Sequence, residues 1–99
     1  MRYRFSKRNL EALCYEEEGA AKYPTAVVDA FFEVIGVVEA ARDERDLYAL
    51  KSLHFERLKG KRKRERSVRL TKQYRLTFAL ESDSEGKYLE IIEIEKHYQ

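Results

Sequence analysis

Half of the lysine and arginine residues of this sequence lie within nineteen consecutive positions. The segment from Arg57 to Arg75 holds ten of the twenty basic residues and a single acid, Glu65, which makes its formal charge +9. The remaining ten bases and seventeen acids leave −7 elsewhere, so the net charge of +2 hides a strongly polarised chain. Guanidinium groups present fork-shaped donors that match phosphate oxygens. The segment therefore predicts contact with a polyanion such as an RNA backbone.

Alternating side chains bring two of these arginines together. A strand over 74–80 places its apolar residues on one face and Arg75 on the other, and a strand over 66–70 does the same with Arg69. A three-residue turn at 71–73 sets Arg69 opposite Arg75, whereas a two-residue turn breaks the apolar pattern. Arginines that face each other across a strand pair repel. Their pairing thus indicates a position that an anion visits.

The other cations of the segment have less specific signals. A run of charges is often only a solvated surface, and it can also dock an acidic protein. Both alternatives stay open for the cations of the loop before 66–70. The candidates for widening the positive surface are Lys59, Lys61, Arg62, Lys63 and Arg64.

Length and composition predict one small globular domain spanning residues 1–99. No apolar run reaches the roughly 18–20 residues of a membrane span, and the N-terminal residues lack the apolar stretch of a signal peptide. A single cysteine, Cys14, fits a reducing compartment, so we expect a cytoplasmic protein. The spacing of Cys14, His54 and His97 matches no zinc site, and we expect neither a metal nor a cofactor.

Periodicity predicts helices in the first half of the chain and strands in the second. A short strand at 2–5 precedes a helix that begins at a Ser6 cap and ends near Gly19. A strong amphipathic helix follows at 24–41, and 42–50 can add a third. Further strands are expected at 53–59, 66–70, 74–80 and 87–95, the last two joined by a turn at 81–87. This order predicts an α+β fold with the helices packed on one face of a sheet.

The residues around the basic segment resemble the HigB branch of the RelE/ParE toxin superfamily. The family pattern is approximately Leu-Lys-Gly, a basic loop, Ser-Ile-Arg, a short turn and Gln-(Tyr/Trp)-Arg. Here these read "LKG" (58–60), "KRKRE" (61–65), "SVRL" (67–70) and "QYRLTF" (73–78). The closing Asp-Tyr-His of many members appears as Lys96-His97-Tyr98.

The resemblance implies a small RelE-like fold, which is a curved, mainly antiparallel sheet with two to three N-terminal helices on one face. It further implies a bacterial type II toxin that cuts messenger RNA on the translating 70S ribosome and is silenced by a helix-turn-helix, HigA-like antitoxin. Two alternatives remain open. ParE-like relatives inhibit DNA gyrase, and a basic domain can also be a non-catalytic RNA- or ribosome-binding module.

Metal-free RNA cleavage by the ribose 2′-OH needs a base, an acid and fixed positive charge. We expect Arg69 and Arg75 to hold the phosphate, with Lys59 and Arg66 as supporting cations. The family motif favours His97 as the proton carrier, with His54 as the alternative in the strand before the basic loop. Tyr98 could donate a proton or stack on a base. The expected RNA-binding residues are Lys59, Lys61, Arg62, Lys63, Arg64, Arg66 and Lys96.

Overall fold

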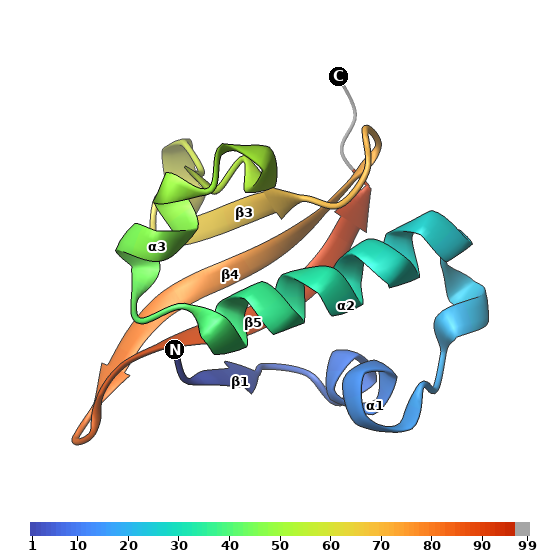
Figure 1. The fold of residues 1–99 in the computed structure, drawn as a ribbon, viewed down its shortest axis with the longest axis horizontal. Coiled ribbons are helices and arrows are strands. Elements are labelled where there is room, and N and C mark those ends of the chain that lie inside the picture. The colour runs from blue at the N-terminus through green and yellow to red at the C-terminus, as the bar shows by residue number, and fades with distance from the viewer. Residues whose placement is uncertain (97–99) are drawn as a thin grey trace.

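The computed structural model describes residues 1–96 and consists of a helical layer against a five-stranded sheet (Figure 1). The strands follow the order β1-β5-β4-β3-β2, and every neighbouring pair is antiparallel except β1 with β5. The mainly antiparallel α+β fold expected from the sequence is confirmed. The elements are β1 Tyr3–Phe5, α1 Arg8–Glu16, η1 Ala20–Lys22, α2 Thr25–Ala40, α3 Glu44–Ala49, η2 Lys51–Leu53, β2 Glu56–Arg57, η3 Gly60–Arg62, β3 Glu65–Arg69, β4 Tyr74–Asp83 and β5 Gly86–Lys96.

Helix α2 supplies the apolar layer that covers the sheet. Its buried side chains recur at helical spacing, and the predicted helix over 24–41 is confirmed to within a residue at each end. These side chains join one core cluster with the inward residues of the two long strands, among them Leu76, Phe78 and Leu89. No helix within residues 1–96 is long and apolar enough to cross a membrane.

The two predicted hairpins are present. Arg69 pairs with Arg75 across β3 and β4, and the Leu70 amide donates to the Tyr74 carbonyl at 2.9 Å, as the three-residue turn requires. The second hairpin turns at Gly86, whose φ of 113° lies where side chains are strongly disfavoured. The sheet therefore carries the arginine pair at the end where β3 turns into β4.

A β-bulge changes which residues of β5 lie opposite β4. From the turn to Phe78 the register is regular, with Phe78 opposite Ile91, but Thr77 then lies opposite Glu93. Such an extra residue shifts every later pair by one position. As a result Arg75 faces Glu95, where a regular hairpin would have placed Ile94.

The strand predicted at 53–59 is wrong for most of its length. Residues Lys51–Leu53 form a 3₁₀ turn, and only Glu56–Arg57 pair with β3. His54 follows the turn with a φ of 52°, so it does not lie in a strand. The local hydrogen bonds explain the difference. The amides of Leu53 and His54 donate to the carbonyls of Leu50 and Lys51, so these amides are not available for pairing with a neighbouring strand.

The first helix is shorter at both ends than predicted. The Ser6 amide donates to the Ile91 carbonyl at 2.9 Å and so extends the pairing of β1 with β5. The N-cap position moves to Lys7, which makes no side-chain cap bond. At the other end Glu17, with a φ of 56°, terminates the helix before Gly19.

Candidate functional site

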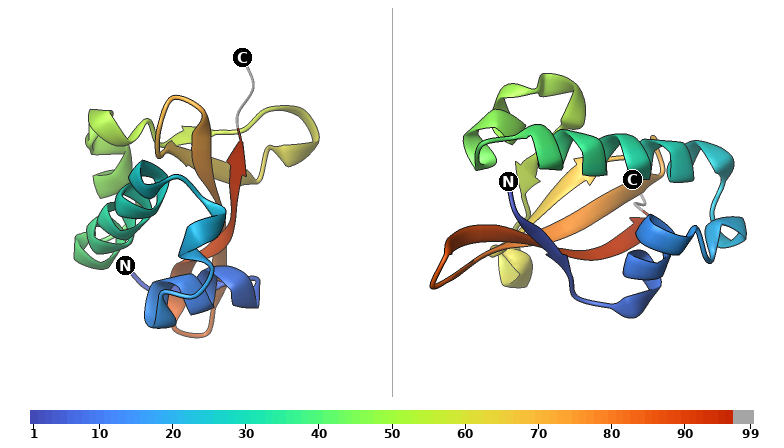
Figure 2. Two further views of the ribbon diagram at one scale, coloured as in Figure 1. Left: turned by 90° about the vertical axis from the view of Figure 1, so that its right-hand side faces the viewer. Right: turned by 60° about the horizontal axis from the view of Figure 1, so that its bottom comes forward.

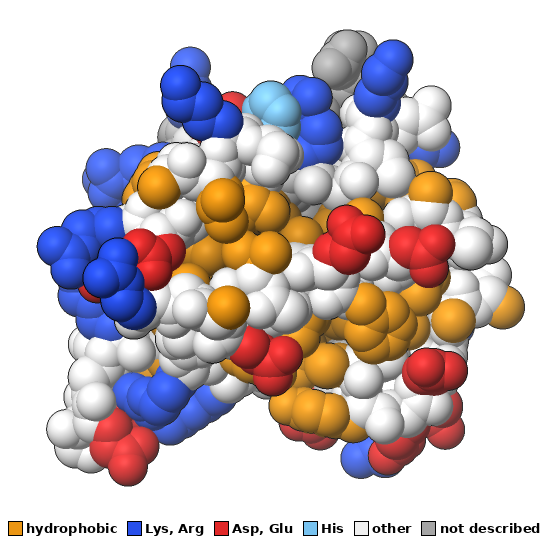
Figure 3. Space-filling view, viewed as in Figure 1, with side chains coloured by type: hydrophobic (Ala, Val, Ile, Leu, Met, Phe, Trp, Pro, Cys, Tyr) orange, Lys and Arg blue, Asp and Glu red, His pale blue; other side chains and the backbone are white. Residues whose placement is uncertain are grey.

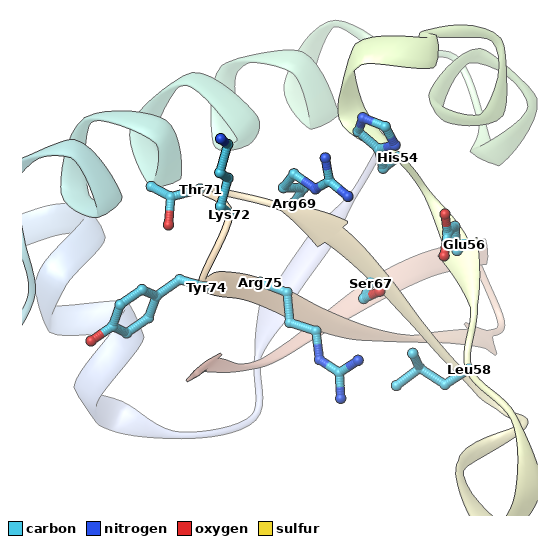
Figure 4. A pocket seen from close by; sticks show the side chains of 9 residues that line it. All are labelled: His54, Glu56, Leu58, Ser67, Arg69, Thr71, Lys72, Tyr74 and Arg75. Carbon is cyan, nitrogen blue, oxygen red and sulfur yellow. The ribbon is translucent and has the colours of Figure 1, made fainter. Parts of the chain in front are cut away.

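A pocket of about 90 Å³ opens at the end of the sheet where β3 turns into β4 (Figure 4). It brings together three residues that the sequence had singled out from separate segments, namely Arg69, Arg75 and His54. Its lining consists of His54, Glu56, Leu58, Ser67, Arg69, Thr71, Lys72, Tyr74 and Arg75. The pocket thus joins two guanidinium groups and an imidazole, which is the set of groups that the proposed phosphate chemistry needs.

Arg69 is the exposed member of the arginine pair. Within residues 1–96 its side chain makes no hydrogen bond or ion pair, so its guanidinium retains its full capacity to bind an anion. Figure 4 shows this guanidinium extending toward His54, while the side chain of Arg75 extends away from it. An anion that binds at Arg69 therefore lies next to the imidazole.

Arg75 is half-buried and already engaged. Its Nη2 donates to Glu95 Oε1 at 3.2 Å. Its Nε is buried and finds no acceptor among the described residues. A buried donor without a partner is uncommon and marks a place to look for function. Glu95 offsets part of the repulsion that two facing arginines create.

Arg62 does not behave as the loop cation that the sequence predicted. It donates to both oxygens of Glu65, at 2.7 Å from Nη2, and to both oxygens of Glu95, at 3.0 Å from Nη1. These two carboxylates raise the pKa of the guanidinium above its usual value. Arg62 is therefore an internal ion-pair partner, half-buried where its loop neighbours are exposed.

Arg66 lies on the other side of the sheet from the arginine pair. It sits opposite Phe78 in the β3–β4 ladder, and its Nε donates to the hydroxyl of Tyr48 in α3 at 3.1 Å. Because side chains alternate along a strand, Arg66 shares the helix side with Val68, while Arg69 points the opposite way. The structure thus does not join Arg66 to the expected phosphate clamp.

The remaining predicted RNA contacts are exposed, but none of them lines the pocket: Lys59, Lys61, Lys63, Arg64 and Lys96. Figure 3 shows that, on the helix face, basic side chains lie mainly along the left and upper margins, whereas acidic ones are spread across the face and gather at the lower right. His97 and Tyr98 lie outside the described residues. Within residues 1–96 no three His, Cys, Asp or Glu side chains are grouped so that they could hold a metal ion.

Two residues that the sequence did not single out, Glu65 and Glu95, organise the cations of this site. Glu95 is twenty positions from Arg75 and thirty-three from Arg62. A regular hairpin about Gly86 would have placed Ile94 opposite Arg75, so the sequence showed only that an acid, Glu95, lies one position away from the expected partner. The β4–β5 bulge shifts the register by that one position and brings Glu95 opposite Arg75.

The Glu95 carboxylate makes stability depend on pH. Its hydrogen bonds with Arg62, and secondly with Arg75, lower its pKa from 4.5 to about 2 against the opposing effect of burial. A carboxylate with a depressed folded-state pKa stabilises the fold fully above its unfolded value. That contribution is lost as pH falls through the folded value.

We therefore expect Glu95→Gln to cost on the order of 2 kcal/mol of unfolding free energy near pH 6. The gap between wild type and variant should narrow to less than about half by pH 3, because pH 3 lies below the unfolded-state pKa of Glu95 and much of the stabilisation from its lowered folded-state pKa is then lost. Urea unfolding at a series of pH values measures this difference in unfolding free energy. Asp43 and Asp83 also have pKa values lowered to about 2, but they are common to both proteins and cancel. A gap independent of pH would contradict the expectation.

Comparison with known proteins begins with the fold. The "YoeB/ParE toxin from Agrobacterium tumefaciens" superposes with a TM-score of 0.59 at 18% identity, covering 99% of this chain and 100% of the other. The whole chain thus has the fold of a small toxin of this kind.

The sequence then narrows the class. The model of the family described as "RelE-like toxin of type II toxin-antitoxin system HigB" matches residues 3–92. "Toxin HigB-1" from Vibrio cholerae is 32% identical over 78 residues, which are 79% of this chain and 82% of that protein. The chain belongs to the HigB-like toxins of type II toxin–antitoxin systems. Membership implies an antitoxin partner.

Proposed function

We propose that this toxin, with residues 1–99 forming a single domain, is a ribosome-dependent mRNA endonuclease silenced by a HigA-like helix-turn-helix antitoxin. The observation that carries the proposal is the exposed, unpaired Arg69 at a pocket that His54 also lines. A pure docking surface would require positive charge but no imidazole beside it. Family membership points the same way.

The chemistry follows from these groups without a metal ion. A base takes the proton of the ribose 2′-OH, the 2′-oxygen attacks the adjacent phosphorus, and the bond from phosphorus to the 5′-oxygen breaks. An acid protonates the departing 5′-oxygen. Arg69 stabilises the negative charge that develops on the phosphorane, and Arg75 supplies a second positive charge nearby. His54 is the described candidate for a proton carrier, and His97 and Tyr98 remain candidates beyond the described residues.

The dimensions of the pocket favour a reaction that takes place on the ribosome. At about 90 Å³ it lies well below the roughly 300–1,000 Å³ of typical ligand sites, so it grips only one phosphate and its neighbours. A strand of mRNA must then be held by something else. The ribosome does this, and the exposed cations Lys59, Lys61, Lys63 and Arg64 offer phosphate contacts to its RNA.

The test is primer extension on a reporter mRNA after brief induction of wild type and of Arg69→Ala. We expect cuts within translated codons, none in the untranslated leader, and none with the variant. Growth arrest with intact mRNA would reject the nuclease and move the proposal to gyrase, the ParE-like alternative. Neither cuts nor arrest would favour the non-catalytic binding module.

A further inference from the structure

One carboxylate connects the two arginines of the site that are not freely exposed. Glu95 accepts from Nη1 of Arg62 at 3.0 Å and also from its Nη2, and it accepts from Nη2 of Arg75 at 3.2 Å. Glu65 accepts from Arg62 at 2.7 Å. The exposed fractions of the Glu95 and Arg75 side chains are only 17% and 22%, so water screens their ion pair less than one at the surface. We call these four residues the Arg62 clasp.

The clasp joins segments that the sheet keeps apart. Glu95 lies on β5, whereas Arg62 lies in η3, which connects β2 to β3, and β4 separates β3 from β5 in the sheet. The first view of Figure 2 shows the loop around η3 on the side of the sheet away from α2. Arg62 must therefore reach across the helix-free face to meet Glu95, and in doing so it holds the basic loop against that face.

The clasp also sets the charge around the pocket. Of the three guanidinium groups of Arg62, Arg69 and Arg75, those of Arg62 and Arg75 are ion-paired with the clasp carboxylates. Arg69 is the only one of the three without an ion pair in the described part of the chain. Thr77, two residues after Arg75 and on the same face of β4, is fully buried. Arg75, which is half-buried, is thus held at the edge of a packed region, whereas Arg69, which is exposed, faces the open pocket.

We propose that Glu95 is a positioning residue of this site: it orients Arg75 directly and, through Arg62, holds the basic loop against the helix-free face of the sheet. This inference rests on the nuclease function proposed above. Glu95 is not itself a proton carrier. Its pKa of about 2 leaves it without a proton to give at neutral pH and makes it a weak base, far from the pKa near the working pH that general catalysis favours.

Kinetics on ribosomes programmed with an mRNA test the proposal, using Glu95→Gln, Arg62→Ala and the double variant. We expect each single variant to lower kcat on the order of ten- to a hundredfold and to change KM less. The reason is that Arg75 would no longer be held in the position that the reaction needs. The double variant should be no worse than either single one, since both break the same clasp. Arg45→Ala, which alters an exposed α3 arginine, is the matched control and should keep wild-type kinetics.

A second readout does not depend on RNA. Side-chain NMR of ¹⁵N-labelled toxin should give slowly exchanging Arg62 Nη–H signals in wild type that exchange faster in Glu95→Gln, because Nη1 and Nη2 are the atoms that donate to Glu95. Wild-type kinetics in Glu95→Gln would overturn the proposal. So would a loss that far exceeds that of Arg62→Ala, which would make Glu95 a participant in the chemistry. If wild type itself cuts nothing, the nuclease function fails and the positioning role with it, even where the NMR signals still report the clasp.

Discussion

Arg69→Ala should lower the rate of mRNA cleavage by about 10²–10³-fold, the usual loss when one donor to a developing negative charge is removed. The Arg69 side chain is exposed and makes no hydrogen bond or ion pair in the described structure, so its removal should remove the proposed phosphate contact and change the fold little. Single-turnover cleavage on programmed ribosomes measures the effect. Arg69→Lys should retain part of the rate, because the ammonium keeps the charge but not the fork-shaped donors.

Two comparisons make this result specific. Arg45→Ala removes an equally cationic side chain from α3, whose preceding residue, Glu44, contacts Lys87 beside the β4–β5 turn, at the other end of β4 from Arg75. It should cleave at the wild-type rate. The unfolding free energy of Arg69→Ala should stay within about 0.5 kcal/mol of wild type, as expected for a surface change. Normal cleavage by Arg69→Ala would mean that Arg69 does not hold the reacting phosphate.

Phe78→Ala should reduce the unfolding free energy by about 3–5 kcal/mol. Phe78 is fully buried in the middle of β4, its ring centroid lies 6.2 Å from that of Phe55, and its position marks the start of the bulge. The loss combines removed apolar burial with the cavity that remains. Against a total of about 5–15 kcal/mol for a small domain, much of the stability disappears.

Urea unfolding followed by circular dichroism measures this change. Phe78→Leu is the matched control, since it fills most of the same space and should cost about 1–2 kcal/mol. A loss below about 1 kcal/mol for the alanine variant would mean that the neighbouring side chains close the cavity. Phe78 would then contribute less to the core cluster between α2 and β4 than its full burial implies.

Local patterns were sufficient for the parts of the molecule that depend on neighbours in sequence. The helical spacing of apolar residues in α2 and the alternation in β3 and β4 identified those elements correctly. The same alternation predicted the pairing of Arg69 with Arg75, because a short turn leaves few possible registers. The same alternation also implied that Arg66 shares a face with Val68 and points away from Arg69. The expectation of Arg66 as a supporting cation was based on the high charge of the segment and did not take this into account.

Only the tertiary structure determined which charges meet. The 3₁₀ turn that removes His54 from a strand depends on local hydrogen bonds that an aromatic, branched stretch does not reveal. The bulge between Thr77 and Phe78 is one extra residue in an otherwise regular ladder, yet it exchanges Ile94 for Glu95 opposite Arg75. Arg62 then reaches this same carboxylate across two strands. Sequence periodicity predicts which residues share a face, whereas a half-buried ion pair requires distant segments to meet within a few ångströms, and packing of the whole chain decides that.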